Sequence, residues 1–519
     1  MGYNDILFKT YDTFVGGQNS SSAPDNLADK EVRSAVNVDV VNRGALVTRD
    51  GTVESDWDCL ADLAEVEDPG PIKKFAEFST PSGTLIQMVL VNGTLYNRAS
   101  ETPLLENAGD YMDFTVYNNK MYMFIKDSYY TYDGTTFTEC TNTETGSMIS
   151  TVKKCKYIVA RADRIFASGH PDSPNTLYYS QIGNPTYFKS GDHMVQAASA
   201  DGDFITGLAE FNEALIVFKT RGIWAWFGYS VTSDVQFVRL NVHTGTRHER
   251  TIANVGNYLF FLGEDGVYAM TGTASGNINT AKVSTPVDDQ FANFSRGASD
   301  YDNTAVGCYA NGKYYLCYTS NEGEETTLNN RFLVCHVEAG ADDKMMPWTV
   351  YQGIDASAIL KSGDGNLYFA SALVPKVYQF SSARYVDYND ATIDFSIVLK
   401  DYHMDSPIHL KKFKRAWIRV SQLVESNTEF DVDVKIDYRS TVFEDLSADE
   451  SMVWDKGEWG IDRWGWLDTV LKPLKLGAKG IRCAITITGE CTSSNRNRMF
   501  LYGVAFMFKA KKPYKESEV

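Results

Sequence analysis

The 519-residue sequence lacks the features of a membrane-spanning chain or a disulfide-rich secreted scaffold. No apolar run reaches the 18 residues that a transmembrane helix needs. Residues 1–14 lack a basic region followed by an apolar core, so we expect no signal peptide. The eight cysteines are scattered and form no C-x-x-C pair, which excludes the usual zinc and redox spacings. We therefore expect reduced thiols in a chain that folds in a cytoplasm.

Common catalytic and cofactor-binding motifs are also missing. No G-x-S-x-G, P-loop, dinucleotide fingerprint or kinase motif set occurs. Two close histidine pairs, His243 with His248 and His403 with His409, lack the H-x-x-x-H spacing of a helical metal site. Asp and Glu are numerous, but the sequence singles out no glycosidase pair. We expect a non-enzymatic protein without catalytic, metal-binding or cofactor-binding residues and without a cofactor.

Basic residues are too few for ordinary nucleic-acid binding. The chain has 49 Lys and Arg against 67 Asp and Glu, a net charge of -18. Residues 1–385 hold 29 basic and 46 acidic residues, a net of -17, whereas residues 386–519 hold 20 and 21. Tight phosphate binding needs Lys and Arg to replace counterions. The acidic body argues against such binding, but it suits a surface past which DNA slides without sticking.

What the sequence does contain is a hairpin pattern that recurs seven times. In its clearest copies, residues 214–228 and 258–272, an apolar strand, a tight polar turn and a second strand with an aromatic residue follow one another. The markers of the second strand are Tyr96, Tyr130, Tyr178, Trp224, Tyr268, Leu333 and Tyr378. A further strand precedes each hairpin, and a repeat of about 45 residues with three or four strands is typical of β-propellers.

We therefore predict an all-β chain with an about seven-bladed β-propeller, in preference to a stack of β-sandwiches. The blade count stays open by one, because an N-terminal strand can close the ring. Residues 386–519 differ, since residues 428–438 and 480–489 alternate strictly between apolar and polar positions. The expected inward residues are Phe430, Val432, Val434, Ile436, Tyr438, Ile481, Cys483, Ile485 and Ile487. This pattern predicts a C-terminal antiparallel β-sandwich.

Two further strands are expected at 415–420 and 499–508. The second is apolar on both faces, so it is either central in the sheet or covered by a partner. The predicted organisation is an N-terminal arm with ring-closing strands (1–60), a β-propeller (61–385) and the β-sandwich (386–519).

Three segments are candidate interfaces. Residues 16–52 either close the ring or grip a neighbouring subunit, and their second half reads as a strand pair turned at 42–44. A cluster of four tryptophans either folds onto the sandwich core or anchors an interface. A basic run either forms a solvated face or docks to an acidic neighbouring surface. The candidate residues are Asn37, Asp39, Arg43, Gly44, Arg49, Lys411, Lys412, Lys414, Arg415, Trp454, Trp459, Trp464 and Trp466.

The N-terminal motifs resemble a known family. The stretch F-x-G-G-x-N contains Phe14, Gly16, Gly17 and Asn19, and N-V-D-V-x-x-R-G-A-L-x-x-R-x-G runs from Asn37 to Gly51. Together they resemble the opening of bacteriophage tail-nozzle and packaged-DNA-stabilisation proteins, which bear propellers and lie below the portal and adaptor of short-tailed phages. Segments 164–188, 205–228 and 411–420 add to the resemblance. At motif level it covers about a third of the chain.

The resemblance implies a structural virion protein of the tail, assembled in the cytoplasm of the host bacterium. It implies a homohexameric ring whose channel retains the packaged DNA and conducts it during ejection, without sequence-specific binding. The implied partners are other copies of the chain, the adaptor or portal-side proteins, and tail fibre or tip proteins. The resemblance implies no catalytic residues, and the lack of a long apolar run predicts no membrane segment.

Charge fits this interpretation. Six copies of the acidic part would give the ring a charge of about -100, which repels phosphates and lets DNA pass. We expect acidic propeller loops to line the channel and the sandwich with its basic run to dock to neighbours. Two alternatives stay open: a receptor- or glycan-binding propeller of a tail tip, and a propeller glycosidase.

Overall fold

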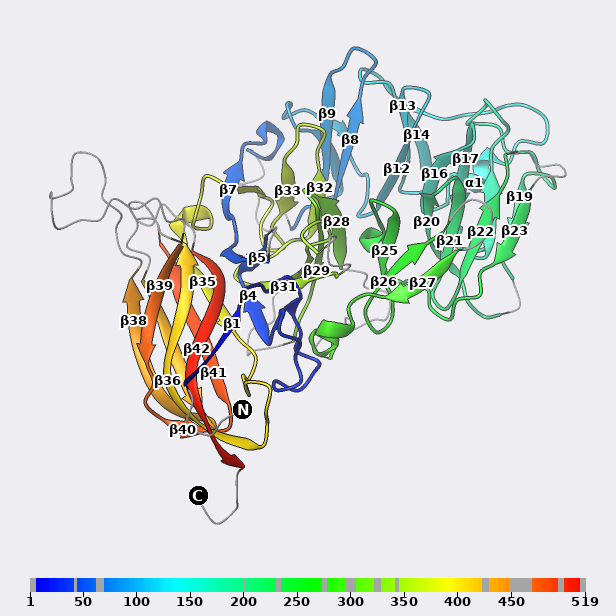
Figure 1. The fold of residues 1–519 in the computed structure, drawn as a ribbon. Coiled ribbons are helices and arrows are strands. Elements are labelled where there is room, and N and C mark those ends of the chain that lie inside the picture. The colour runs from blue at the N-terminus through cyan, green and yellow to red at the C-terminus, as the bar shows by residue number, and fades with distance from the viewer. Residues whose placement is uncertain are drawn as a thin grey trace.

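A computed structural model gives the fold of the chain. The described residues are 6–41, 44–61, 70–198, 201–229, 235–272, 278–292, 294, 305–321, 328–340, 345–421, 429–447, 469–492 and 499–513. They are almost entirely strands (Figure 1). The helices among them are short: α1 (Ile149–Val152) and the 3-10 turns η1 (Asp58–Leu60), η3 (Glu249–Thr251), η4 (Thr285–Phe291) and η5 (Tyr388–Asp390). None of these helices has the length and apolar character needed to cross a bilayer.

Six separate four-stranded antiparallel sheets make a six-bladed β-propeller. Five of them use four consecutive strands. The first two sheets are β8 (Lys74–Ser79), β9 (Leu85–Val91), β10 (Thr94–Asn97), β11 (Pro103–Leu105), and β12 (Met112–Tyr117), β13 (Lys120–Ile125), β14 (Ser128–Tyr132), β15 (Phe137–Glu139). The third is β16 (Tyr157–Arg161), β17 (Arg164–Ser168), β18 (Thr176–Tyr179), β19 (Met194–Gln196). The next two are β20 (Ile205–Phe211), β21 (Ala214–Lys219), β22 (Ile223–Phe227), β23 (Gln236–Arg239), and β24 (Ala253–Val255), β25 (Tyr258–Leu262), β26 (Val267–Thr271), β27 (Asn279–Lys282).

The sixth separate sheet joins the two ends of the propeller. It orders β32 (Ala358–Lys361), β33 (Leu367–Ala370) and β34 (Val377–Ser381) beside the N-terminal strand β7 (Gly51–Ser55). β7 runs antiparallel to β34, with Val377 opposite Ser55 and Ser381 opposite Gly51. The first strand of this sheet, β32, also contacts β8 of the first sheet. An N-terminal strand thus closes the ring, which was one of the two expected roles of residues 16–52.

An 11-stranded sheet continues from the propeller into the C-terminal part. It begins with β28 (Val306–Ala310), β29 (Lys313–Tyr318), β30 (Arg331–Cys335) and β31 (Trp348–Tyr351), ordered like the strands of a blade. The order continues through β4 (Ser34–Val36), β35 (Ile393–Val398), β41 (Cys483–Cys491), β37 (Glu429–Ile436) and β38 (Arg439–Ser447). Two short strands, β2 (Gly17–Gln18) and β3 (Glu31–Val32), attach beside β31.

A seven-stranded sheet lies beside these C-terminal strands (Figure 1). Its main order is β39 (Thr469–Lys475), β36 (His409–Ser421), β42 (Phe500–Pro513), β6 (Leu46–Thr48) and β5 (Val38–Val40). β1 (Ile6–Tyr11) pairs with β42, and β40 (Lys479–Gly480) pairs with β36. β5 and β6 are antiparallel neighbours on either side of residues 42–44, as the expected strand pair requires.

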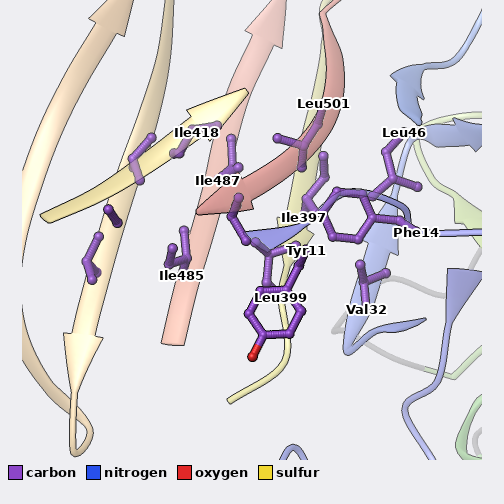
Figure 2. Close-up of a cluster of buried hydrophobic side chains, with 14 of the residues drawn as sticks. Tyr11, Phe14, Val32, Leu46, Ile397, Leu399, Ile418, Ile485, Ile487 and Leu501 are labelled. Atoms are coloured by element: carbon purple, nitrogen blue, oxygen red, sulfur yellow. The ribbon is translucent and has the colours of Figure 1, made fainter. Parts of the chain in front are cut away.

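Buried side chains form one large cluster in the C-terminal part and smaller ones between propeller sheets. In the C-terminal cluster, side chains from the start of the chain pack with side chains from its last quarter. Figure 2 shows the labelled members Tyr11, Phe14, Val32, Leu46, Ile397, Leu399, Ile418, Ile485, Ile487 and Leu501. Hydrophobic burial therefore joins the two ends of the chain in this cluster.

Tight turns explain why the hairpins form where they do. Asn118 and Asn119 between β12 and β13 have φ angles of 46° and 58°, and Asn212 and Glu213 between β20 and β21 have 45° and 61°. Two consecutive residues at positive φ match the right-handed twist of the strands that they join, and Asn tolerates this region best among residues with a side chain. The repeat is therefore set by short local turns.

The all-β class and the propeller are confirmed, whereas seven blades and a separate C-terminal sandwich stay predictions. All seven predicted marker residues lie on the third strand in their run of four, from Tyr96 on β10 to Tyr378 on β34. One expected inward residue is wrong. Tyr438 is 61% exposed, because β37 ends at Ile436 and the turn that follows carries Tyr438 outward at a φ of 65°.

Candidate functional site

The motif from Asn37 to Gly51 forms a buried polar joint between the propeller and the C-terminal strands. Arg49 is 1% exposed, and its guanidinium donates to both carboxylate oxygens of Asp387 at 2.9 and 2.6 Å. Its Nε donates to Oδ1 of Asn37 at 3.0 Å, and the Asn37 amide donates to the backbone oxygen of Asp394 at 2.7 Å. A bidentate pair with further hydrogen bonds is how a charge removed from water is stabilised. Arg49 thus joins the segment before the propeller to the segment after it.

A second buried carboxylate, Asp39, faces the strands β29 to β31. It accepts hydrogen bonds from Nζ of Lys313 at 2.7 Å and from the hydroxyl of Tyr351, and it lies 3.8 Å from Nε2 of His336. Burial raises the pKa of Asp39, but the charge of Lys313, together with the smaller effects of His336 and of the hydrogen bonds from Lys313 and Tyr351, lowers it further, so that the pKa lies below its usual value. Burial lowers the pKa of His336 to about 3, so this imidazole is neutral near pH 7.

The F-x-G-G stretch lies against β31 so closely that a side chain would not fit. Gly17 has a φ of 65°, and a Cβ there would lie 2.8 Å from the backbone nitrogen of Trp348. Only glycine combines this backbone conformation with such an approach. The next residue, Gln18, is buried, and its side-chain oxygen accepts a hydrogen bond from the backbone nitrogen of Ala35 at 3.0 Å. The motif residues are therefore explained by contacts inside the chain.

The joint makes one sheet continuous from the propeller to the C-terminal strands (Figure 1). In β4, Val36 lies opposite Val350 of β31 on one side and opposite Ser396 of β35 on the other. A displacement of one strand is transmitted to the next, because backbone hydrogen bonds hold the neighbouring strands in register. The N-terminal segment is the strand that links the two parts of the molecule.

The interface candidates in this segment are mostly internal. Asn37, Asp39, Gly44 and Arg49 are buried, and the polar ones make the bonds described above. Arg43 lies outside the described residues. That the segment also grips a neighbouring subunit stays a prediction.

The basic run on β36 divides between the two faces of the sheet. Lys411 is 1% exposed and therefore does not belong to the expected surface run. Burial lowers its pKa to about 8. Its Nζ donates to three backbone carbonyl oxygens, those of Ser406, His409 and Ile481. Lys412 and Arg415 are exposed and Lys414 is half-buried. Trp454, Trp459, Trp464 and Trp466 lie outside the described residues.

Sequence reasoning missed a cluster of charged and phenolic side chains at the centre of the propeller. The first strands of neighbouring sheets contact one another, and the contact of β32 with β8 closes their ring around the axis. At the start of these strands, Nζ of Lys74 binds Asp113 at 2.8 Å, and Arg250 of η3 donates to a backbone oxygen, that of Ser357, at 2.6 Å. The rings of Tyr111 and Tyr157 meet edge to face with centroids 6.5 Å apart.

We call this group of side chains the axial cluster. Its members are Lys74, Tyr111, Asp113, Tyr157, Glu249 and Arg250, and its charges influence one another's pKa values. Burial raises the pKa of Glu249, while the charges of Arg250 and Lys74 oppose the rise and Asp113 adds to it. A carboxyl group with a raised pKa near a second carboxylate is the arrangement of general acid–base pairs. No sequence signal marked the axial cluster, because its members, spread from residue 74 to residue 250, become neighbours only once the repeats are arranged around the axis.

The described residues give little support for a reactive cysteine or a metal-binding site. All eight cysteines are free thiols, and seven of them are buried. Burial raises the pKa of Cys59 and Cys140 to about 12, which keeps these thiols protonated and unreactive. Among the described residues, no three His, Cys, Asp or Glu side chains gather in a way that could hold a metal ion.

Comparison with known proteins yields only distant structural likenesses. No protein-family model matches the sequence, and no curated protein matches it. The WD40 domain of Pan2 from Neurospora crassa is 8% identical with a TM-score of 0.37, over 66% of this chain and 97% of that one. BamB from Moraxella catarrhalis is 11% identical with a TM-score of 0.31, over 65% and 98%. An exo-β-1,3-galactanase from Phanerochaete chrysosporium is 10% identical with a TM-score of 0.25, over 67% and 94%.

These likenesses carry no functional argument at such identities and TM-scores. One similar structure is named as a galactan-cleaving enzyme and another as a WD40 domain. Any catalytic role must therefore be argued from the residues of this chain, because one fold can host unrelated functions.

Proposed function

We propose that the chain is a structural subunit of a bacteriophage tail, a nozzle protein whose ring retains packaged DNA and conducts it during ejection. The observation that carries the proposal is the joint. The motif that resembles the nozzle family, Asn37 to Gly51, supplies the buried pair between Arg49 and Asp387 and lies beside the strand β4 that links propeller and C-terminal strands. A wall subunit under pressure from packed DNA needs such a rigid connection between its parts.

The proposed architecture is a seven-bladed propeller followed by a C-terminal sandwich. Strands β28 to β31 have the order of the six separate blades, and β28 contacts the first strands β24 and β32 on either side. We therefore count them as the seventh blade. The second half of the 11-stranded sheet and the seven-stranded sheet enclose the C-terminal cluster between them, which is the arrangement of a sandwich.

Charge supports a passage that does not hold DNA. Residues 1–385 carry a net charge of -17. In a ring of six the summed field would repel phosphates at short range, and salt would screen it beyond about 8–10 Å. Tight binding would stall ejection, because every phosphate contact would have to break as the DNA moves.

Native mass spectrometry and DNA-binding measurements test this proposal. The expected particle contains six chains of 58.0 kDa each, and it should produce no mobility shift of linear DNA at about 50 mM salt. A chain that stays monomeric at every concentration, or one that binds DNA tightly with a steep salt dependence, would contradict the proposal. Localisation of the chain to purified tails by antibody labelling tests the virion assignment directly.

A second function, binding or hydrolysis of a host glycan, is favoured by the axial cluster alone. Glu249 with its raised pKa would act as the acid, and Asp113 would be the second carboxylate. Turnover of host polysaccharide that is lost in Glu249→Gln and kept in Glu264→Gln, a change at a propeller turn, would establish it. Binding on a glycan array without turnover would instead indicate a receptor-binding propeller.

A further inference from the structure

The outward face of the seven-stranded sheet is apolar and exposed. Its inward face is part of the C-terminal cluster, where Phe413 and Phe506 are buried. On the opposite face, Ile6 and Phe8 of β1 are 47% and 67% exposed, and Leu471 of β39 is 57% exposed. Soluble proteins rarely leave several large apolar side chains together in water without a function. We call this surface the outer face.

Strand register shows that these residues form one continuous surface. Phe8 lies opposite Met507 of β42, and Arg419 of β36 lies opposite Leu471. Residues directly opposite each other in antiparallel strands point to the same side of a sheet. Trp417 of β36 connects the two ends, because its ring centroid lies 6.5 Å from that of Phe8 and its partner on β39 is Pro473.

Basic side chains surround the apolar part of the outer face. The exposed ones are Lys412, Arg415, Lys475 and Lys479. Lys412 lies opposite Lys509 of β42, and Arg415 lies opposite Lys475 of β39, so like charges face each other across the strands. Such pairs repel in an isolated sheet. They would gain from an acidic surface placed over them.

Acidic groups at the edge of the outer face are already paired. Asp12 binds Arg419 at 3.3 Å, and Asp405 binds Lys9 at 2.7 Å. These pairs leave the exposed Lys412, Lys475 and Lys479 as the basic surround of the apolar part. The chain itself carries the complementary charge, since residues 1–385 have a net charge of -17 and residues 386–519 a net of -1.

We propose that the outer face binds the acidic propeller of a second copy of this chain. Apolar contact would supply the stability of the complex, and the basic surround would fix its orientation and speed its formation. The choice of a second copy as the partner rests on the ring of the proposed function. The evidence for the surface itself is the exposure of its side chains and the strand register given above.

A matched pair of substitutions tests the inference. Leu471→Asp places a charge on the outer face, on its edge strand β39, and Tyr438→Asp places one at the turn between β37 and β38 of the other sheet, where the tyrosine is 61% exposed. Both sites are exposed, so both variants should fold like the parent. Sedimentation across a concentration series should show association weakened about tenfold or more by Leu471→Asp and left unchanged by Tyr438→Asp.

Zero-length cross-linking between labelled and unlabelled chains identifies the partner surface. Carbodiimide should link Lys412, Lys475 or Lys479 of one chain to acidic residues within 70–385 of the other. Links only within one chain, including links to the acidic, Trp-rich segment 448–468, would overturn the inference. So would links that join the propellers of two chains while Leu471→Asp still assembles.

The outcomes separate this inference from the proposed function. A ring of six that survives Leu471→Asp leaves the nozzle proposal intact and refutes the outer face as its contact. A parent chain that is monomeric at all concentrations and forms no links between chains refutes both. Loss of association in both aspartate variants alike would show a general effect of added negative charge and would also refute the assignment to this face.

Discussion

The propeller and the C-terminal strands bury their apolar side chains in different ways. In the propeller, a cluster unites two sheets that follow each other in sequence, as where Phe218 of β21 packs on Phe261 of β25 with ring centroids 5.1 Å apart. In the C-terminal cluster, Tyr11 meets Phe506 edge to face at 6.2 Å, so residues from the two ends of the chain are in contact. Apart from the sheets that close the ring, the propeller is built from local contacts, whereas the C-terminal cluster is built from the most distant ones in the sequence.

The difference teaches where the molecule is vulnerable. Local repeats form as soon as two neighbours exist, whereas a core that needs both ends of the chain must close a long loop first. The buried joint is the place where the two kinds of construction meet. A change there should uncouple the two parts, while a change inside either part should remain local.

The largest expected effect follows from removing the buried cation of the joint. Arg49→Ala leaves the carboxylate of Asp387 without its partner, and breaking one side of a buried pair costs about 3–5 kcal/mol. Urea unfolding should show a lower midpoint, and intrinsic fluorescence and far-UV circular dichroism should give transitions that no longer coincide. Coincident transitions in the variant would contradict the role of Arg49 in coupling the two parts.

A matched control is available nearby. Arg384 binds Asp390 at 3.0 Å, but its side chain is 36% exposed and that of Asp390 is 67% exposed. Exposed pairs contribute about 0–1 kcal/mol. Arg384→Ala should therefore leave the urea midpoint close to that of the parent, which separates the effect of burial from the loss of an arginine.

The next-largest loss of stability is expected from substitutions of two equally buried leucines. Leu259 on β25 and Leu501 on β42 are both fully buried, one in the propeller and one in the C-terminal cluster. Each change to alanine should cost about 2–5 kcal/mol through lost transfer energy and the cavity left behind. Hydrogen exchange should then show lost protection around β25 in Leu259→Ala, but in β1, β6 and β36 together in Leu501→Ala. Equal spreading in both variants would contradict the comparison.

The features that could be predicted from the sequence are those that depend on local contacts. The seven hairpins were predictable, because each consists of a short apolar strand, a tight turn and an aromatic marker such as Trp224 within a few residues. The fourth strands were not identified one by one. β19 and β23, for example, contain half-buried or exposed residues only, so they lack the apolar alternation that reveals a strand.

The joint and the outer face were predicted less well for a physical reason. The sequence marked Asn37, Asp39 and Arg49 as candidates, but their partners Asp387, Lys313 and Tyr351 are remote, so nothing showed that these charges would be buried. Lys411 was counted with its neighbours although its side chain points inward. The apolar pattern of 499–508 did indicate that both faces of that strand matter, but only strand register identifies the residues beside it.

A smaller effect is expected from pH. Burial lowers the pKa of His336 to about 3, against about 6.5 in an unfolded chain. Between these values the unfolded chain binds a proton that the folded chain does not, so stability falls as the pH drops below about 6.5. At pH 5 the loss from this group is about 2 kcal/mol. Urea unfolding at pH 7 and pH 5 should show a smaller difference in His336→Gln than in the parent.

The exposed His243 supplies the control for that measurement. His243→Gln makes the same replacement at an exposed imidazole and so separates the effect of burial from the loss of a histidine. If His336→Gln keeps the full difference, the acid sensitivity belongs to other groups. Asp39 adds a loss of the same sign at lower pH, since its folded pKa is also lowered.

The smallest effect concerns the closure of the ring. Lys376 binds Glu54 at 2.9 Å between β34 and β7, and both side chains are nearly half exposed. If the backbone ladder from Gly51 to Ser55 closes the ring, Lys376→Ala should change the free energy of unfolding by less than about 1 kcal/mol. Hydrogen exchange of the β7 amides should then stay as slow as in the parent. Faster exchange confined to β7 and β34 would mean that the ion pair, rather than the ladder, keeps this last strand in place.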